Sequence, residues 1–296
     1  MSKKLRVSVA AFELRKYRDF GQFLSHVEEV VADAKSNKSR VLVLPELVCI
    51  GLLWLNERAS NVSNSEIGAF YREVLTPLLP RFIGGMLKLA AENDIYIIGA
   101  SFWHEENSFG RNSAFVFKPN GEYIRQDKIH MTRGERAINT VGGDRLVPFE
   151  IDGVKCGLFT CYDVQFPELT RHLVHNHGVE AIFIPSLTDD RGKWRVYYSG
   201  HARAIENQCF VCVSTLVGSM DIPTDYVSQL QGTPFVASPI DNRFAIDDGN
   251  ISIGEDGACL ISCDLDIELL HKSRERSEIR QLSDRRDDVY SKLFEV

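Results

Sequence analysis

The chain alternates between short apolar runs and longer segments with apolar residues at helical spacing, and this alternation is the strongest constraint on its fold. Three of the short runs have the composition of buried strands: 5–12, 41–44 and 95–102. Between them, 20–34 and 66–92 are typical of helices, the second interrupted near Pro77 and Pro80. This strand–helix order predicts a mostly parallel sheet covered by helices.

After residue 102 the pattern adds pairs of strands joined by tight turns. Asn120-Gly121 is a strong signal for a hairpin between 113–118 and 122–126. Asp152-Gly153 and Asp256-Gly257 mark further turns. The remaining expected strands and helices follow in order: 146–151, 154–160, 167–177, 181–185, 198–206, 209–214 and 258–265. Because no Pro-, Gly- or Ser-rich linker divides these elements, we predict one α/β domain.

The last 26 residues, 271–296, are highly charged. A charge run of this kind is usually a solvated tail. Tyr290, Leu293 and Phe294 add an apolar stripe that could instead dock on a neighbouring surface. The domain is therefore divided into a main part, 1–270, and this C-terminal segment.

Composition excludes several classes of function. The 296 residues can bury a sizeable core, and a net charge of −7 without a basic stripe argues against nucleic-acid binding. The run 7–12 is too short for a signal peptide, and no apolar stretch approaches the ~20 residues that span a bilayer. Seven cysteines, an odd number, indicate reduced thiols. We expect a cytoplasmic protein that binds neither nucleic acid nor a membrane.

Cys161 is the candidate nucleophile because of its position between a strand and a helix. The apolar run 154–160 precedes it, and 162–169 has the marks of a turn that opens a helix. Oriented backbone N–H groups there favour a thiolate. By contrast, Cys209 and Cys212 would point to opposite faces of one strand, so they could not share a metal ion. We expect no metal site.

Glu46 and Lys128 also stand where expected strands end. Glu46 follows the all-apolar run 41–44 and Pro45, at the edge of the sheet where α/β proteins place their binding crevice. Burial there would raise the pKa of its carboxyl group towards that of a general base. Near a thiol, Lys128 would stabilise the thiolate and a developing oxyanion. Taken alone, each residue could equally be an ordinary surface charge.

Together these residues resemble the Glu-Lys-Cys triad of the nitrilase superfamily of carbon–nitrogen hydrolases. The matching motifs are Leu44-Pro45-Glu46, Asp127-Lys128-Ile129-His130 and Thr160-Cys161-Tyr162-Asp163. Lys128 lies 82 residues after Glu46, and Cys161 lies 33 residues after Lys128, which is similar to that family's layout. Three further segments match in order: 166–168, 202–208 and 285–290. The resemblance covers essentially the whole chain.

The resemblance implies a fold, a mechanism and a partner. The fold is a four-layer α-β-β-α sandwich. Glu135 matches a second glutamate beside the nucleophile, although it could be a solvated charge, and the backbone N–H of Tyr162 becomes an oxyanion donor. No metal or organic cofactor is needed. Family members commonly form homodimers or higher homo-oligomers, often with the C-terminal segment, here 271–296, over the partner.

The residues around Cys161 narrow the reaction. Tyr162-Asp163 resembles the amidase and carbamoylase branches, whereas true nitrilases usually have Trp after the cysteine. A linear amide or an N-carbamoyl compound is therefore the favoured small-molecule substrate. A nitrilase and a non-catalytic binding or regulatory member remain alternatives. Thr160 and Gln165 depart from the family pattern, and Gln165 removes the basis for any carboxylate recognition tied to an arginine there.

Two expected loops, 187–198 and 218–234, are the candidate walls of the substrate pocket. Four residues of the first are predicted to contact substrate: Asp189, Trp194, Arg195 and Tyr197. Their mixed charge is compatible with an amine-bearing or a carboxylate-bearing substrate. Arg195 and the tyrosines could instead pack in a dimer interface.

Overall fold

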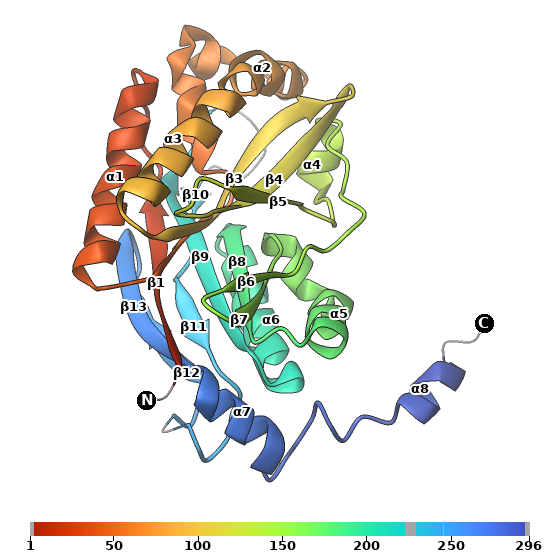
Figure 1. Ribbon diagram of the computed structural model, residues 1–296. Coiled ribbons are helices and arrows are strands. Elements are labelled where there is room, and N and C mark those ends of the chain that lie inside the picture. Colours follow the sequence, from red (N-terminus) through yellow and green to blue (C-terminus); the bar gives the residue numbers. More distant parts are fainter. Residues whose placement is uncertain (1–2, 223–228, 245, 294–296) are drawn as a thin grey trace.

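The computed structural model describes residues 3–222, 229–244 and 246–293, and its centre is a 13-stranded sheet (Figure 1). The main strands run in the order β5-β4-β3-β2-β1-β9-β8-β7-β6. The strands are β1 (Lys4–Glu13), β2 (Val41–Leu44), β3 (Tyr96–Glu106), β4 (Phe109–Phe117), β5 (Tyr123–Asp127), β6 (Phe149–Ile151), β7 (Val154–Leu158), β8 (Ala181–Leu187), β9 (Phe210–Ser219), β10 (Gln229–Leu230), β11 (Phe235–Ala237), β12 (Asn250–Ile253) and β13 (Cys259–Asp266).

The described residues also form eight α-helices and four short 3₁₀ segments. The α-helices are α1 (Phe20–Ser36), α2 (Ile67–Val74), α3 (Leu79–Glu92), α4 (Arg133–Ala137), α5 (Pro167–His177), α6 (Gly192–Asn207), α7 (Ile267–Arg276) and α8 (Asp287–Leu293). The 3₁₀ segments are η1 (Val48–Leu55), η2 (Glu57–Asn61), η3 (Thr76–Leu78) and η4 (Cys161–Gln165).

The centre of the sheet is parallel and its two ends are antiparallel hairpins. β1 pairs in parallel with β2 and β9, and β2–β3, β8–β9 and β7–β8 are also parallel. The hairpins β3-β4-β5 and β6-β7 extend the two ends. β5 therefore runs in the same direction as β2 and β7, so the carboxyl ends of these three strands meet at one edge of the sheet.

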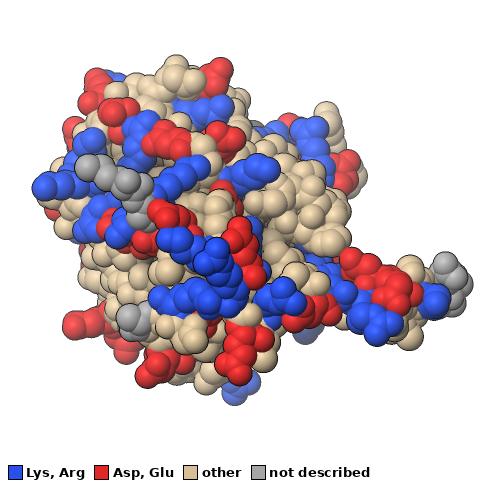
Figure 2. All heavy atoms as spheres, turned by 60° about the horizontal axis from the view of Figure 1, so that its bottom comes forward, with Lys and Arg blue, Asp and Glu red and all other residues tan. Residues whose placement is uncertain are grey.

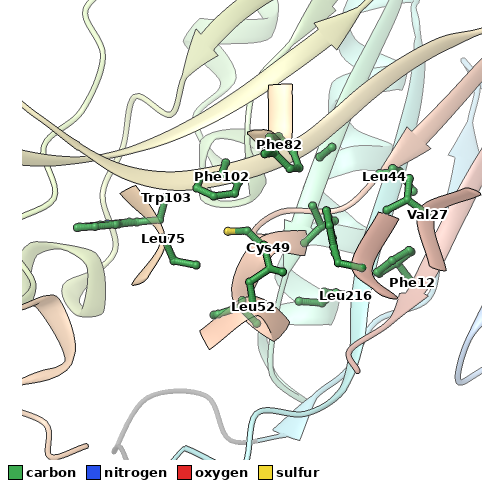
Figure 3. Packing of buried hydrophobic residues seen from close by; sticks show 14 of the residues in the cluster. Phe12, Val27, Leu44, Cys49, Leu52, Leu75, Phe82, Phe102, Trp103 and Leu216 are labelled. Carbon is green, nitrogen blue, oxygen red and sulfur yellow. The ribbon is translucent and has the colours of Figure 1, made fainter. Parts of the chain in front are cut away.

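The sheet folds back on itself, and three apolar clusters separate four layers. One cluster lies between α1 or α3 and the first half of the sheet, and Figure 3 shows part of it around Phe82, Phe102 and Cys49. A second fills the space between the two halves, from Val9 and Val43 to Phe183. The third lies between the second half and α5 or α6. The α-β-β-α sandwich is confirmed.

Most expected elements are present, with shifted ends. α6 begins at Gly192 rather than 198, and β6 begins at Phe149 rather than 146. Cys209 lies in the cluster below α6, whereas Cys212 lies between the two sheet halves, so the two thiols point to opposite faces as expected.

Within the described residues, Ile67–Glu92 is the one stretch with the length and composition to cross a membrane, and it is not a clear span. It has 26 residues, and an 18-residue window within it has a mean hydropathy of 1.3. In the structure the stretch is divided at η3, where Pro77 cannot donate a backbone hydrogen bond. The buried side chains of α2 and α3 include Phe70, Phe82 and Met86, and they pack in the cluster over β3.

The C-terminal segment leaves the body of the protein. α7 is anchored at the end of β13 through Leu270, whereas α8 has no buried residue and lies away from the sandwich (Figure 1). Figure 2 shows this projecting part as closely mixed acidic and basic side chains. Tyr290 and Leu293 are at least partly exposed, and Phe294 lies outside the described residues.

Candidate active site

The structure brings the four expected site residues together at the carboxyl edge of the sheet. Glu46 follows β2, Lys128 directly follows β5, and Cys161 follows β7 by way of Phe159 and Thr160. Glu46, Lys128 and Cys161 are 3%, 2% and 6% exposed, although composition alone left the first two as possible surface charges. The common strand direction explains why residues so far apart in sequence meet here.

Lys128 is held between two carboxylates. Its Nζ lies 2.8 Å from Glu46 Oε1 and 2.9 and 2.8 Å from the two oxygens of Glu135. Burial opposes the charged ammonium, but Glu135 and Glu46 raise the pKa of Lys128 well above its ordinary value. Lys128 therefore stays protonated and is a fixed positive charge at the site.

Both oxygens of Glu46 are occupied. Oε1 accepts from Lys128 and from Asn112 Nδ2, at 2.8 Å each, and Oε2 accepts from the backbone N–H of Leu187 at 3.0 Å. Burial raises the pKa of Glu46, and the nearby charge of Glu135 adds to this, while Lys128 opposes it. A buried carboxyl group with a raised pKa that lines the same cavity as Cys161 is suited to accept a proton from the thiol.

Cys161 stands at the sharp bend between β7 and η4. Its φ of 48° lies in the left-handed region, which few residues other than glycine adopt. Sγ lies 3.4 Å from the carbonyl oxygen of Leu187. Burial and the charge of Glu46 raise the pKa of the Cys161 thiol. The resting side chain is therefore a neutral thiol that needs a base, and a strained bend of this kind is typical of functional sites.

Asp163 fixes this bend to the residues that follow Lys128. Its buried carboxylate accepts from the backbone N–H groups of Ile129 at 3.1 Å, His130 at 2.7 Å and Thr160 at 3.2 Å. His130 Nδ1 lies 2.9 Å from the same carboxylate. Asp163 thus joins the end of β5 to the bend that carries Cys161.

Glu135 is also part of a helix cap. Thr132 Oγ1 accepts from the backbone N–H of Glu135, and Glu135 Oε2 accepts from the backbone N–H of Thr132 at 2.9 Å. The sequence Thr132-Arg133-Gly134-Glu135 is a capping-box pattern that could have been recognised. The cap explains how Glu135 keeps its carboxylate beside Lys128.

A cavity of about 1260 Å³ opens onto Glu46, Lys128, Glu135 and Cys161. Its volume is sufficient for a small molecule. Apolar side chains form one wall, with the Tyr71 and Trp103 rings 5.6 Å apart and edge to face. Tyr162 and Gln165 line the cavity beside Cys161.

Only half of the expected substrate contacts reach this cavity. Asp189 and Arg195 line it, with 3.9 Å between Asp189 Oδ1 and Arg195 Nη2. Trp194 does not: it is 52% exposed on α6 and stacks on Tyr198. Tyr197 also points elsewhere, and its hydroxyl accepts from Asn250 at 3.0 Å. On a helix, residues one apart face different directions, so consecutive positions could not all face the pocket.

The second expected wall is only partly described. Met220, Gln229 and Gln231 line the cavity, and 223–228 lie outside the described residues. Sequence reasoning missed Asn112, which contacts both Glu46 and Glu135.

Comparison with curated proteins gives relatives over almost the whole chain. The probable hydrolase YhcX of Bacillus subtilis is 31% identical over 289 residues, which are 97% of this chain and 54% of YhcX. The chain therefore spans about half the length of that relative. Omega-amidase NIT2 of Xenopus tropicalis is 26% identical over 301 residues, with 97% of each chain covered.

Solved structures share the fold at lower identity. An amidase from Nesterenkonia sp. AN1, in a form showing Michael addition of acrylamide at its active-site cysteine, superposes with a TM-score of 0.74 at 19% identity, over 98% of this chain and 100% of that one. Nit3 of Saccharomyces cerevisiae, a member of branch 10 of the nitrilase superfamily, gives a TM-score of 0.73 at 18% identity, over 96% and 98% of the two chains.

A sequence model of the carbon-nitrogen hydrolase family matches residues 8–249, which contain all four site residues. This match covers most of the chain, and the sandwich and the grouping of the site agree with it. The chain belongs to the carbon–nitrogen hydrolase family.

Proposed function

We propose that this protein hydrolyses the carbon–nitrogen bond of a linear amide or an N-carbamoyl compound through a thioester on Cys161. The observation that carries the proposal is the grouping of Cys161, Glu46 and a Lys128 ammonium fixed by two carboxylates at the wall of one cavity.

In the first half-reaction, Glu46 accepts the proton of Cys161 and the thiolate attacks the carbonyl carbon. The Lys128 ammonium and the backbone N–H of Tyr162 stabilise the oxyanion of the tetrahedral intermediate. Glu46 then returns the proton to the leaving nitrogen. The carbon–nitrogen bond breaks, ammonia or an amine departs, and the acyl group stays on sulfur.

In the second half-reaction, water attacks the thioester. Glu46 removes a proton from the water, with Glu135 positioned beside it, and the second tetrahedral intermediate uses the same oxyanion donors. Collapse breaks the carbon–sulfur bond, and Glu46 returns the proton to the Cys161 thiolate. No step of this scheme uses a metal ion or an organic cofactor.

The distal part of the substrate is proposed to contact Asp189 and Arg195, the charged pair that lines the cavity. Tyr162 after the nucleophile favours an amide or carbamoyl substrate over a nitrile. A nitrilase would use the same residues, and a panel that contains matched amides and nitriles distinguishes the two reactions by ammonia release.

We further propose that the protein is cytoplasmic and forms a homodimer or higher homo-oligomer. In it, the C-terminal segment, 271–296, of one subunit docks on the main part, 1–270, of its partner. Exposed aromatic side chains on α6, Trp194 and Tyr198, and the projecting α8 support an apolar contact between copies. Neither nucleic acid nor a membrane is a proposed partner. Concentration-dependent sedimentation of the full chain and of a chain ending at Arg276 tests the docking.

The test of the reaction is turnover by Cys161→Ala and Glu46→Gln on a panel of amides, carbamoyl amino acids and carbamoyl amines. Each variant should lose hydrolysis but remain folded, with a cooperative unfolding transition like that of the wild-type protein. Cys259→Ala, on β13, is the control and should keep full activity. Intact-mass analysis should find an acyl adduct on Cys161. Turnover retained in Cys161→Ala would contradict the scheme.

The non-catalytic alternative has its own readout. A thiol-reactive probe that labels Cys161 no faster than the half-buried Cys259 and Cys263 would favour a binding or regulatory protein. We expect faster labelling of Cys161, because Glu46 can accept its proton and the cavity gives the probe access.

A further inference from the structure

Asn112 completes a closed ring of hydrogen bonds with the three charged residues of the site. Its Nδ2 donates to Glu46 Oε1 at 2.8 Å and to Glu135 Oε1 at 3.0 Å. Lys128 Nζ donates to the same two oxygens, at 2.8 and 2.9 Å. Two donors, one charged and one neutral, thus bridge the two carboxylates, and Asn112 is only 1% exposed.

The orientation of the Asn112 amide is fixed from its other side. Ser101 Oγ donates to Asn112 Oδ1 at 2.7 Å and accepts from the backbone N–H of Leu47 at 2.8 Å. Because that N–H can only donate, the Ser101 hydroxyl proton must point to the amide oxygen. A reversed amide would place its oxygen against Glu46 and Glu135 and lose the two hydrogen bonds to these carboxylates.

An irregular strand places Ser101 for this contact. β3 contains one extra residue against β4 between Gly99 and Phe102, a β-bulge. Gly99 has φ 88°, and a Cβ there would lie 2.2 Å from the carbonyl oxygen of Leu44, so only glycine fits. The backbone N–H of Ser101 donates to the carbonyl of Pro45, next to Glu46, at 3.3 Å. The bulge therefore places Ser101 in contact with the residues on both sides of Glu46.

The ring of hydrogen bonds stabilises a net negative charge in a buried place. Glu46 and Glu135 are two carboxylates around one ammonium, so the three charges leave a net negative charge in a buried place. A second ammonium would neutralise the base, whereas a neutral amide stabilises both carboxylates without adding a charge.

We propose that Asn112 is a positioning residue that keeps Glu46 in the ionised, correctly turned form in which it can accept the Cys161 proton, with Ser101 as the group that orients it. The tests of this role that measure turnover rest on the proposed function, whereas the test by alkylation of Cys161 does not. The titratable groups that face Glu46 are Lys128, Glu135 and Cys161. Asn112 adds donors to this set but no titration of its own.

Asn112→Leu, of similar size but without donors, is the direct test. Loss of a donor to a carboxylate favours its protonated form, so the acid limb of the kcat/KM profile should move to higher pH. At neutral pH kcat should fall roughly 10- to 100-fold, as expected for a lost hydrogen bond to a buried charge. Ser101→Ala keeps the amide but frees its orientation, so it should shift the limb in the same direction by less.

Ser113→Ala is the matched control. Ser113 is the next residue on β4 and is also buried, but its hydroxyl contacts His104, Asp127 and Arg125 instead of the site. The variant loses buried hydrogen bonds of the same kind. It should lower stability to a similar extent and leave the acid limb where the wild-type protein has it.

Alkylation of Cys161 by iodoacetamide, followed by peptide mass analysis across pH, tests the same role without a substrate. Its acid limb should move upward in Asn112→Leu and Ser101→Ala but not in Ser113→Ala. If Asn112→Leu does not fold, Ser101→Ala carries the test. An unchanged limb in the folded site variant would overturn the role of Asn112. A wild-type protein that hydrolyses no member of the panel would instead overturn the proposed function and leave the alkylation result standing.

Discussion

The edge of the sheet around Lys128 and the C-terminal segment around α8 both contain ion pairs with short N–O distances. Lys128 Nζ lies 2.8 Å from Glu46 Oε1, with side chains 2% and 4% exposed. Arg286 Nη2 lies 2.7 Å from Asp288 Oδ2, with side chains 66% and 60% exposed. The two pairs have nearly the same N–O distance and differ in the burial of their side chains.

The difference teaches where charge has consequences. An exposed pair is screened by water and contributes little, whereas a buried charge without its partner is strongly destabilising. At the site, every charge therefore depends on its neighbours, and their pKa values shift. An exposed pair of the C-terminal segment, such as Arg286 and Asp288, is expected to contribute little to stability.

The largest effect should follow Lys128→Met. It leaves Glu46 and Glu135 facing each other in a buried place, and removal of one partner from such a set costs about 3–5 kcal/mol of unfolding free energy. Turnover should fall roughly 1000-fold with loss of the oxyanion donor. Urea unfolding and ammonia release measure the two effects. Lys118→Met is the control, since Lys118 pairs with the exposed Glu122 at 2.9 Å. If both variants lost the same unfolding free energy, burial would not explain the difference between the two regions.

Asp163→Asn should have the next largest effect. Oδ2 accepts from Ile129 N–H and Thr160 N–H, and Oδ1 accepts from His130 N–H. An amide NH₂ at either position would face at least one backbone N–H, so about 1–3 kcal/mol of stability should be lost. Chemical unfolding measures this. The exposed Asp284→Asn, in the C-terminal segment, should lose none.

Most of the strands could be predicted because each depends on local pattern, although the short β10, β11 and β12 were missed. Cys161 stood out by its position, whereas Glu46 and Lys128 were identified through the family resemblance. All three follow strands of one direction, and parallel strands bring such ends together. Asn112 and Ser101 could not be predicted in the same way. Their contact depends on the register of β3 against β4, including one extra residue, and neither composition nor alternation specifies a bulge.

The pocket wall was less predictable for a similar reason. Asp189, Trp194, Arg195 and Tyr197 were expected as a group because they belong to one loop, but most of that loop is the start of α6. The helix sends Arg195 into the cavity and Trp194 to the surface. The direction of a side chain follows from where the helix starts. Asp189 Oδ1 accepts from the backbone N–H groups of Arg191 and Gly192 there, a capping contact that was not recognised in the sequence.

The two glutamates of the site should respond to pH with opposite signs. Burial opposes ionisation of Glu135, but Lys128 outweighs it and lowers the pKa below 4.5, so stability from Glu135 is present above 4.5 and is lost as pH falls through the lower folded value. Burial raises the pKa of Glu46, so its ionisation costs stability as pH rises from 4.5 through the folded value. Urea midpoints across pH should show that the loss on falling pH disappears in Glu135→Gln and that the loss on rising pH disappears in Glu46→Gln.

Glu135→Gln also sharpens the comparison within the site. The charge of Glu135 raises the pKa of Glu46, so its removal should move the acid limb of kcat/KM to lower pH, opposite to Asn112→Leu. Opposite shifts from two neighbours of the same carboxylate would be hard to obtain from a general loss of structure. A limb that moves upward in both variants would contradict the electrostatic account of Glu46.

The smallest effect should follow Arg286→Ala. In the single chain its pair with Asp288 is short but exposed to water, so the melting temperature should not change measurably at a protein concentration low enough to keep the chain monomeric. The measurement is thermal unfolding at two protein concentrations, with Asp288→Ala as the reciprocal variant. A loss of stability that appears only at the higher concentration would show that a partner covers this segment, as the proposed docking requires. The exposed region would then be buried in the assembly, and the contrast with Lys128 would hold for the isolated chain alone.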